Sequence, residues 1–269
     1  MLNSYINTSV APTISRAFGI EAPKLSVPDE ILKPVENMIS DYCGANRKIE
    51  KALIYNPDAV ALWLYQKYTD KFAKVINNTR MALPMRTVMP SVTPVCFATI
   101  YTGVMPSVHG IQRYEKPVLK VDTLFDRLIE NGKKPVIIAP KECSMSKIFK
   151  EREMDYIITN DSDLCFDAAL EALNDDRYDF YAIYEGNYDS VMHGEGVEAE
   201  ISLKQIDINA DHFDRLVKKA RSKWNKEGYK SLFAWITDHG CHNDEIGRGT
   251  HGSDLEEDLN IVHFWGTGD

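Results

Sequence analysis

Short apolar runs alternate with amphipathic stretches along most of this chain, and this alternation restricts the possible fold more than any other feature. Runs that are apolar throughout, separated by helical patterns, are typical of a parallel sheet covered on both faces. The sequence therefore predicts a three-layer α/β/α fold with a mostly parallel central sheet. The expected strands are residues 52–55, 135–139, 155–159, 180–184, 231–236 and 260–265.

The segments between the runs indicate helices. Thr93 precedes a helical run that ends at Thr102-Gly103, and Asp29 is expected to cap a helix over 30–42. Residues 1–28, with three prolines, are expected to form an irregular N-terminal arm. We expect residues 1–269 to form a single domain, because no repeat, low-complexity segment or linker interrupts the pattern. The other predicted helices are 59–74, 123–130, 163–173 and 197–226.

Charge and cysteine content limit the partners and the compartment. The formal net charge is −9 and the pI is about 5.3, which argues against a nucleic-acid polymer as partner because phosphate binding needs a basic surface. A small phosphorylated substrate held by metal ions remains compatible. The five scattered cysteines, the absence of a signal-peptide pattern and the absence of a long apolar run predict a cytoplasmic protein without a membrane span. The sequence does not indicate an oligomeric state.

Acidic and histidine side chains follow three of the predicted strands. A single Asp after a strand is usually a turn or capping residue. Function in an open α/β sheet, however, gathers at the carboxyl ends of the strands, where these residues would meet. Six mixed nitrogen and oxygen ligands are too many for one catalytic ion and suit two, about 4 Å apart. The candidate metal ligands are Asp58, Asp189, His193, Asp238, His239 and His251.

Thr93 is the candidate nucleophile. It stands at the start of a predicted helix, where unpaired backbone N–H groups and the positive end of the helix dipole favour an anionic group such as phosphate. A metal ion bound to its hydroxyl would lower the hydroxyl pKa and activate it. Taken alone, this segment allows an equally good interpretation, in which Thr93 only caps the helix.

Together these motifs resemble the alkaline phosphatase superfamily, in particular its nucleotide pyrophosphatase/phosphodiesterase branch. The resemblance runs from about residue 50 to the C-terminus. The family pattern has a metal-binding Asp after a strand and a nucleophilic Thr or Ser nine residues before a Thr-Gly pair, and four His-containing motifs follow. Here the pattern is met by Asp58, Thr93 with Thr102-Gly103, Pro106-Ser-Val-His-Gly-Ile111, Asp189-Ser-Val-Met-His193, Asp238-His239-Gly240 and Thr250-His251-Gly252.

The resemblance implies a role for each of these residues. Asp189, His193 and His251 would hold one divalent ion, and the other would be held by Asp58, Asp238 and His239 with Thr93 alongside. Zinc is the expected metal, with Mn²⁺ or Fe as alternatives. The implied reaction is hydrolysis of a phosphate ester, by a phosphodiesterase or nucleotide pyrophosphatase, through a covalent phospho-threonine.

Three departures from the family pattern affect this interpretation. The first Asp is usually followed by Gly, but here Ala59 follows Asp58. A Pro often stands two residues after the nucleophile, but here Pro94 follows Thr93 at once. The Asn that the diesterase branch places after His-Gly-Ile is replaced by the stretch 112–116, in which Arg113 or Lys116 is a candidate substitute. Diester preference therefore stays open, with phosphomonoesterase, phosphonate hydrolase and a metal-stabilised non-enzymatic domain as alternatives.

Overall fold

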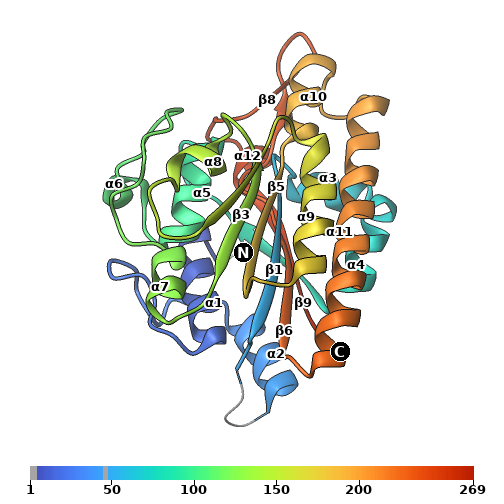
Figure 1. The fold of residues 1–269 in the computed structure, drawn as a ribbon. Helices are drawn as coiled ribbons and strands as arrows, with labels where there is room; N and C mark the ends of the chain where they lie inside the picture. The colour runs from blue at the N-terminus through green and yellow to red at the C-terminus, as the bar shows by residue number, and fades with distance from the viewer. Residues whose placement is uncertain (1–4, 45–47) are drawn as a thin grey trace.

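The computed structural model describes residues 5–44 and 48–269 (Figure 1). In this part of the chain a sheet of seven strands forms the centre, in the order β2-β9-β6-β1-β5-β3-β4. β1, β3, β4, β5 and β6 are mutually parallel where they pair, and β9 is antiparallel to both β6 and β2. The strands are β1 Lys51–Pro57, β2 Met81–Arg86, β3 Pro135–Pro140, β4 Asp155–Thr159, β5 Phe180–Glu185, β6 Ser231–Ile236 and β9 Asn260–Thr267.

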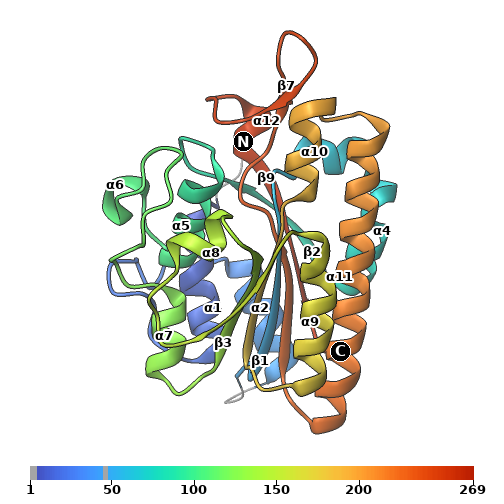
Figure 2. The ribbon, with the colours of Figure 1, turned by 45° about the horizontal axis from the view of Figure 1, so that its top comes forward.

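Helices cover both faces of this sheet, as Figures 1 and 2 show. One face packs against the first group of helices around Phe97, Phe125 and Phe180, and the other packs against the second group around Tyr55, Phe213 and Trp235. The three-layer α/β/α fold predicted from the sequence is therefore confirmed. The first group is α1 Val10–Phe18, α2 Lys33–Cys43, α5 Thr93–Thr102, α7 Leu124–Glu130 and α8 Ser144–Ile148. The second is α3 Leu62–Lys67, α4 Ala73–Asn78, α9 Asp163–Asp175 and α11 Glu200–Glu227.

The predicted irregular N-terminal arm is wrong for residues 7–18, about half of its described length. Residues 1–4 lie outside the described residues, but α1 begins at Val10, ends at Phe18 and is buried against the sheet. Its apolar residues recur at helical spacing, and Gly19 ends it in the left-handed conformation with φ +66°. Pro12 is tolerated because it lies in the first turn, where its missing N–H has no partner to lose.

Other boundaries differ from the predictions for local reasons. The helix expected over 59–74 is broken into α3, a 3₁₀ turn at Thr69–Phe72 and α4. The helix expected from residue 30 begins at Lys33, without a side-chain cap from Asp29, which pairs instead with Arg16. β2 was not predicted, since it lies at the edge of the sheet, half-exposed and with a proline inside it. The helix α10, Asn187–Glu195, was also missed.

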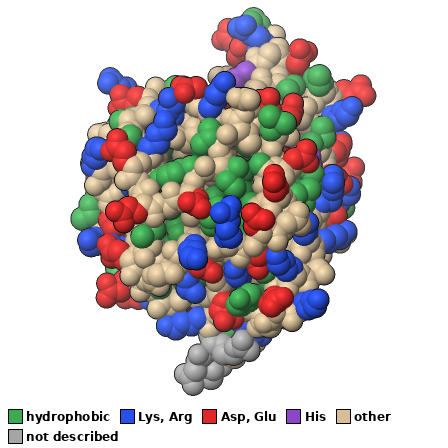
Figure 3. All heavy atoms as spheres, in the orientation of Figure 1, with side chains coloured by type: hydrophobic (Ala, Val, Ile, Leu, Met, Phe, Trp, Pro, Cys, Tyr) green, Lys and Arg blue, Asp and Glu red, His purple; other side chains and the backbone are tan. Residues whose placement is uncertain are grey.

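The surface seen in Figure 3 intersperses acidic and basic side chains, so the net negative charge is not gathered into one area of this face. In the described part of the chain, none of the helices is both long and apolar enough to cross a bilayer.

Candidate two-metal site

The candidate ligands follow three neighbouring central strands and lie at the carboxyl end of the sheet. β1 lies between β5 and β6 and is parallel to both, so their carboxyl ends meet. Asp58 comes directly after β1, Asp238 and His239 follow β6, and Asp189 lies in the first turn of α10 after β5. His251 follows the short strand β8, Gly249–Thr250, which pairs with β7, His242–Asn243.

Asp58, Asp238 and His239 form a fully buried cluster. One potential ligand atom from each lies within 4.8 Å of the other two. His239 Nε2 is 3.4 Å from Asp58 Oδ1 and 3.3 Å from Asp238 Oδ2. We call this group the buried set, since its side chains are at most 1% exposed.

Asp189, His193 and His251 form a second cluster of the same kind. Nε2 of His193 and Nε2 of His251 each lie 3.3 Å from Asp189 Oδ1. The His193 side chain is 44% exposed, so we call this group the open set. The two sets adjoin, because the rings of His239 and His251 stack with their centroids 4.0 Å apart. The structure thus brings all six predicted residues together.

The main chain fixes the orientation of all three imidazoles. Nδ1 of His193 lies 2.9 Å from the Gly249 carbonyl, and Nδ1 of His239 lies 3.0 Å from the Gly240 carbonyl. Nδ1 of His251 lies 3.0 Å from the carbonyl of Ser91. Because a carbonyl oxygen only accepts, each Nδ1 must carry the proton. Each Nε2 is therefore the free ligand atom, turned toward a carboxylate, as in proteins whose histidines bind metals.

The carboxylates have oxygens that lack a donor. Asp58 Oδ2 accepts a hydrogen bond from the Tyr184 hydroxyl at 2.5 Å, and Asp238 Oδ1 accepts one from the Ala59 N–H at 3.2 Å. The other oxygen of each, and Asp189 Oδ1, is buried without a hydrogen-bond donor. Buried carboxylate oxygens normally have a partner. The donor set therefore fits a divalent cation in each cluster, with oxygen and imidazole ligands of the kind that Zn²⁺, Mn²⁺ and Fe accept.

Burial shifts the acid–base properties of the buried set. Burial raises the pKa of Asp58 to about 7, and the nearby Asp189 carboxylate adds to the shift. The pKa of Asp238 is raised well above its usual value by burial and by Asp58, and burial lowers the pKa of His239. A second proton on His239 is therefore disfavoured, and near neutral pH the protons that the metal-free cluster binds lie on its carboxylates.

The open set behaves differently because it is partly solvated. When His193 takes up a second proton, its Nε2 can donate to Asp189, and this interaction raises the pKa of His193 to about 9. Burial acts to raise the pKa of Asp189, but the contacts with His193 and His251, once their Nε2 atoms are protonated, outweigh it and hold that pKa well below the usual value. In the metal-free protein, the positive charge of protonated His193 can therefore balance the negative charge of Asp189, as a bound cation would.

Thr93 is the first residue of α5, as the sequence predicted, and its hydroxyl reaches the buried set. Thr93 Oγ1 lies 3.3 Å from His239 Nε2. Val92 is the N-cap in extended conformation, and Gly103 ends the helix with φ +71°. Pro94 fits in this first turn because its fixed φ suits a helix start. The position after Asp58 also has a geometric reason to favour Gly, since Ala59 has φ +62° here.

Several neighbouring residues have roles that the sequence did not reveal. The Tyr184 hydroxyl holds the Asp58 carboxylate. His242 has its Nδ1 2.6 Å from the buried Asp258 carboxylate. His109 has its Nε2 3.0 Å from the Thr99 hydroxyl and belongs to neither ligand cluster. Neither Tyr184 nor Asp258 belongs to a recognisable motif, so only the fold identifies them.

The two candidates for the missing Asn make other contacts. Arg113 Nε donates to Glu115 at 2.9 Å, and the Arg113 side chain is 81% exposed. Lys116 Nζ donates to the carbonyl of Glu142 at 2.8 Å. The stretch 112–116 therefore gives no direct reason to favour diesters.

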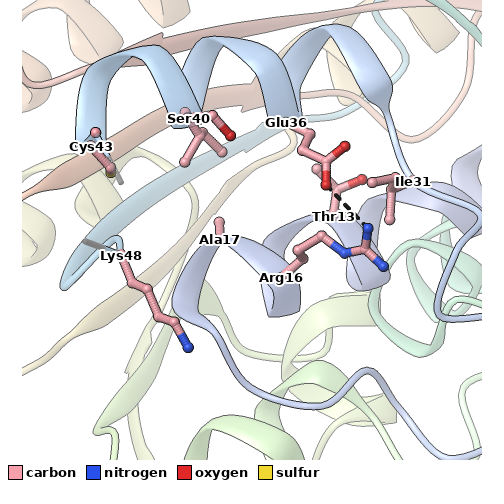
Figure 4. Close-up of a pocket in the computed structure, with 10 residues that line it drawn as sticks. Thr13, Arg16, Ala17, Ile31, Glu36, Ser40, Cys43 and Lys48 are labelled. Carbon is pink, nitrogen blue, oxygen red and sulfur yellow. Dashed lines mark hydrogen bonds and ion pairs between the residues drawn. The ribbon is translucent and has the colours of Figure 1, made fainter. Parts of the chain in front are cut away.

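A cavity between α1 and α2 is separate from these ligands (Figure 4). It has a volume of about 370 Å³, and its lining includes Thr13, Arg16, Glu36 and Lys48. The Arg16 guanidinium is already paired with Asp29 at 2.7 Å and with Glu36 at 3.1 Å, so its charge is not free for an anionic ligand. Although large cavities often mark active sites, the ligand clusters lie at the strand ends instead.

The sheet, its two helical layers and the Asp/His clusters at the strand ends define an alkaline phosphatase-like fold. Solved structures of phosphonoacetate hydrolase from Sinorhizobium meliloti 1021, in complex with phosphonoformate and with phosphonoacetate, share this fold with a TM-score of 0.50 each. Sequence identity is 15% and 14%, respectively. The similarity covers 72% of this chain and 57% of the hydrolase chain, so this chain corresponds to little more than half of that protein's length.

Residues 57–127 match the family model of the type I phosphodiesterases/nucleotide pyrophosphatases. This segment contains Asp58, Thr93 and the His109-Gly110-Ile111 motif. Among curated proteins, none matches the chain significantly. The resemblance to the alkaline phosphatase superfamily that the motifs indicated is confirmed, and both relatives are hydrolases of phosphorus compounds by name.

Proposed function

We propose that this protein is a two-metal hydrolase of small phosphate esters, with phosphodiesters or nucleotide pyrophosphates as the first substrates to test. The observation that carries the proposal is the position of the three imidazole Nε2 atoms. Each faces a carboxylate oxygen that has no donor, in two adjoining clusters, with the Thr93 hydroxyl 3.3 Å from one of them. A divalent cation in each cluster satisfies such an arrangement.

Each of the two ligand sets would hold one metal ion. Asp58, Asp238 and His239 would hold one ion, and Asp189, His193 and His251 would hold the other. When bound, the ions would supply Lewis acidity that polarises the phosphoryl group and lowers the pKa of the Thr93 hydroxyl. Zinc is the metal we expect, because aspartate and histidine ligands suit it, although Mn²⁺ and Fe accept the same ligands.

Thr93 would act as the nucleophile in two displacements. Its hydroxyl gives up its proton to solvent, and Oγ1 forms a bond to phosphorus while the bond from phosphorus to the leaving oxygen breaks. The leaving group takes a proton from water. A water molecule then attacks the phospho-threonine, the P–Oγ1 bond breaks, and Thr93 regains its proton. The positive end of the α5 dipole and the Thr93 N–H would stabilise the phosphoryl oxygens meanwhile, whereas the N–H groups of Val95 and Cys96 already donate to the Val92 carbonyl.

A panel of p-nitrophenyl esters tests the reaction class. We expect metal-loaded protein to hydrolyse bis-p-nitrophenyl phosphate or a nucleoside p-nitrophenyl phosphate with the highest kcat/KM. Preference for p-nitrophenyl phosphate would indicate a phosphomonoesterase. Preference for a phosphonate ester would indicate a phosphonate hydrolase, which the likeness to phosphonoacetate hydrolase makes worth including. Strong metal binding without turnover of any ester would instead support a metal-stabilised non-enzymatic domain.

Removal of the ions should destabilise the protein more at pH 8 than at pH 6. With a bound ion at about 100 times its Kd the stabilisation is about 2.7 kcal/mol per site, so chelation at pH 8 should lower Tm by roughly 5–10 °C. The pKa of Asp58 is raised to about 7, so its ionisation destabilises the metal-free fold increasingly as pH rises toward 7. The pKa of His193 is raised to about 9, so its stabilising protonation is present near pH 6 and is lost as pH rises through 9.

Calorimetric scans with and without a chelator at the two pH values measure this difference. Ions compete with protons for the same ligands, so the gap between loaded and metal-free protein should widen from pH 6 to pH 8. A Tm that does not respond to the chelator at either pH would contradict the two-metal proposal.

We further infer that residues 1–269 form one domain, because strands from Lys51 to Thr267 join one sheet. A reducing cytoplasm agrees with thiols at Cys96, Cys165 and Cys241 that are buried and not disulfide-bonded.

A further inference from the structure

The carboxylate of Asp258 lies between the two segments that carry His239 and His251, although it belongs to neither ligand set. It is fully buried at the helix α12, Glu256–Leu259. Its Oδ1 is 2.6 Å from His242 Nδ1, and its Oδ2 accepts the Ser253 N–H at 2.8 Å. A buried carboxylate with both oxygens hydrogen-bonded is held in one position.

A chain of hydrogen bonds leads from this side chain to His251. Ser253, whose N–H is bound by Asp258, accepts a hydrogen bond at its own carbonyl from the Ser91 hydroxyl at 3.3 Å. The carbonyl of Ser91 then accepts from His251 Nδ1 at 3.0 Å. The ring of His251 is thus oriented by three successive contacts, of which the first depends on the Asp258 carboxylate.

A second chain leads to His239, but it begins at the main chain of Asp258. The Asp258 carbonyl accepts the Gly240 N–H at 2.8 Å, and the carbonyl of Gly240 accepts from His239 Nδ1 at 3.0 Å. The contact is so close that a Cβ on Gly240 would lie 2.0 Å from the Glu257 carbonyl oxygen. Substitution of the Asp258 side chain leaves these main-chain bonds in place.

We propose that Asp258 is a positioning residue for the open set, acting on His251 through Ser253 and Ser91. This inference rests on the proposed two-metal function, since it concerns the orientation of a proposed ligand. Loss of the carboxylate should loosen His251 and weaken the ion held by the open set. The buried set, oriented from the main chain and closed to solvent, should keep its ion. Residues that orient metal ligands typically contribute 10–100-fold to metal affinity.

The test is a Zn²⁺ titration of metal-free protein in competition with a chromophoric chelator, which needs no turnover. We expect wild type to bind two ions. Asp258→Asn should retain one step and weaken the other by about 10–100-fold, and the weakened step should be the one that His251→Ala abolishes.

Asp214→Asn is the matched control. Asp214 is also a buried carboxylate with both oxygens bonded, to Asn78 at 2.6 Å and to Lys218 at 2.8 Å, but it joins α4 to α11 away from the ligands. The Asp214→Asn variant should have a lower Tm than wild type and should keep both Zn²⁺-binding steps. Ser91→Ala, which removes a later contact of the same chain, should weaken the same step as Asp258→Asn and decides the matter if that variant does not fold.

Unchanged affinity in both Asp258→Asn and Ser91→Ala would overturn the positioning role while leaving the two-metal proposal intact. Equal weakening of both steps would also overturn it, because that result indicates a general loss of structure. A wild type that binds no ion would contradict the two-metal function itself.

Discussion

Thr93→Ala should abolish ester hydrolysis, with kcat lowered by at least about three orders of magnitude, while both ions still bind. The hydroxyl is the only part of the side chain that can attack phosphorus, and it lies 3.3 Å from His239 Nε2. The six ligands do not depend on it, so metal content measured by mass spectrometry should stay near that of wild type. Steady-state kinetics on the best ester of the panel give the loss in kcat.

Two further variants of α5 make this result interpretable. Thr93→Ser keeps a hydroxyl at the same place and should retain measurable activity. Thr102→Ala removes a buried hydroxyl at the other end of the helix, where it donates to the Ala98 carbonyl, so it should cost about 1 kcal/mol of stability and little activity. Full activity in Thr93→Ala would show that another group, or water directly, attacks phosphorus.

Asp58→Asn should have opposite effects on stability and on function. At pH 8 the metal-free wild type carries an ionised Asp58 whose pKa is raised to about 7 by burial. Asparagine removes this charge and can still accept the Tyr184 hydroxyl. We therefore expect the metal-free variant to be more stable than metal-free wild type by about 1–3 kcal/mol at pH 8. The advantage should shrink toward pH 5, where the wild-type carboxyl is protonated.

Addition of zinc should reverse the order. Wild type gains stability from two ions, whereas the variant has lost a charged ligand of the buried set and should bind one ion tightly. Its activity should fall by at least about 100-fold. Denaturant unfolding with chelator and with zinc, at both pH values, measures all four stabilities. If Asp58→Asn bound two ions as tightly as wild type, Asp58 would not be a ligand.

Most of the sheet could be predicted because β1, β3, β5, β6 and β9 are buried along their whole length. Such strands are apolar throughout, and the predicted run at 231–236 coincides with β6. β2 escaped prediction because Pro84 lies within its short apolar run, and proline usually argues against a strand. The helix expected from residue 59 begins only at Leu62, for a reason outside the local sequence. The Ala59 N–H donates to Asp238, and the Val60 N–H donates to the Thr237 hydroxyl, so tertiary contacts overrode helical spacing there.

The six candidate ligands could be named from the sequence because metal binding restricts residue types at fixed places after strands. The residues that orient them could not. Tyr184 is one more aromatic in an apolar run, and Asp258 is one of several acidic residues near the last strand. Their roles depend on which oxygen meets which N–H across distant segments, and no local pattern records that. The metal-binding roles of the ligands stay predictions, to be tested by the titrations above.

The carbonyl contacts of the three histidines have a consequence for how such a protein can change over evolutionary time. Gly249, Gly240 and Ser91 hold the imidazoles through peptide oxygens, which every amino acid possesses. Side chains that make none of the contacts described above are therefore free to vary without turning the rings away, whereas Gly240 and Gly249 are not, because a Cβ at either would lie within 2.2 Å of a neighbouring atom. A protein with this scaffold can acquire new substrate preferences through substitutions around the two ligand clusters while the clusters themselves are retained.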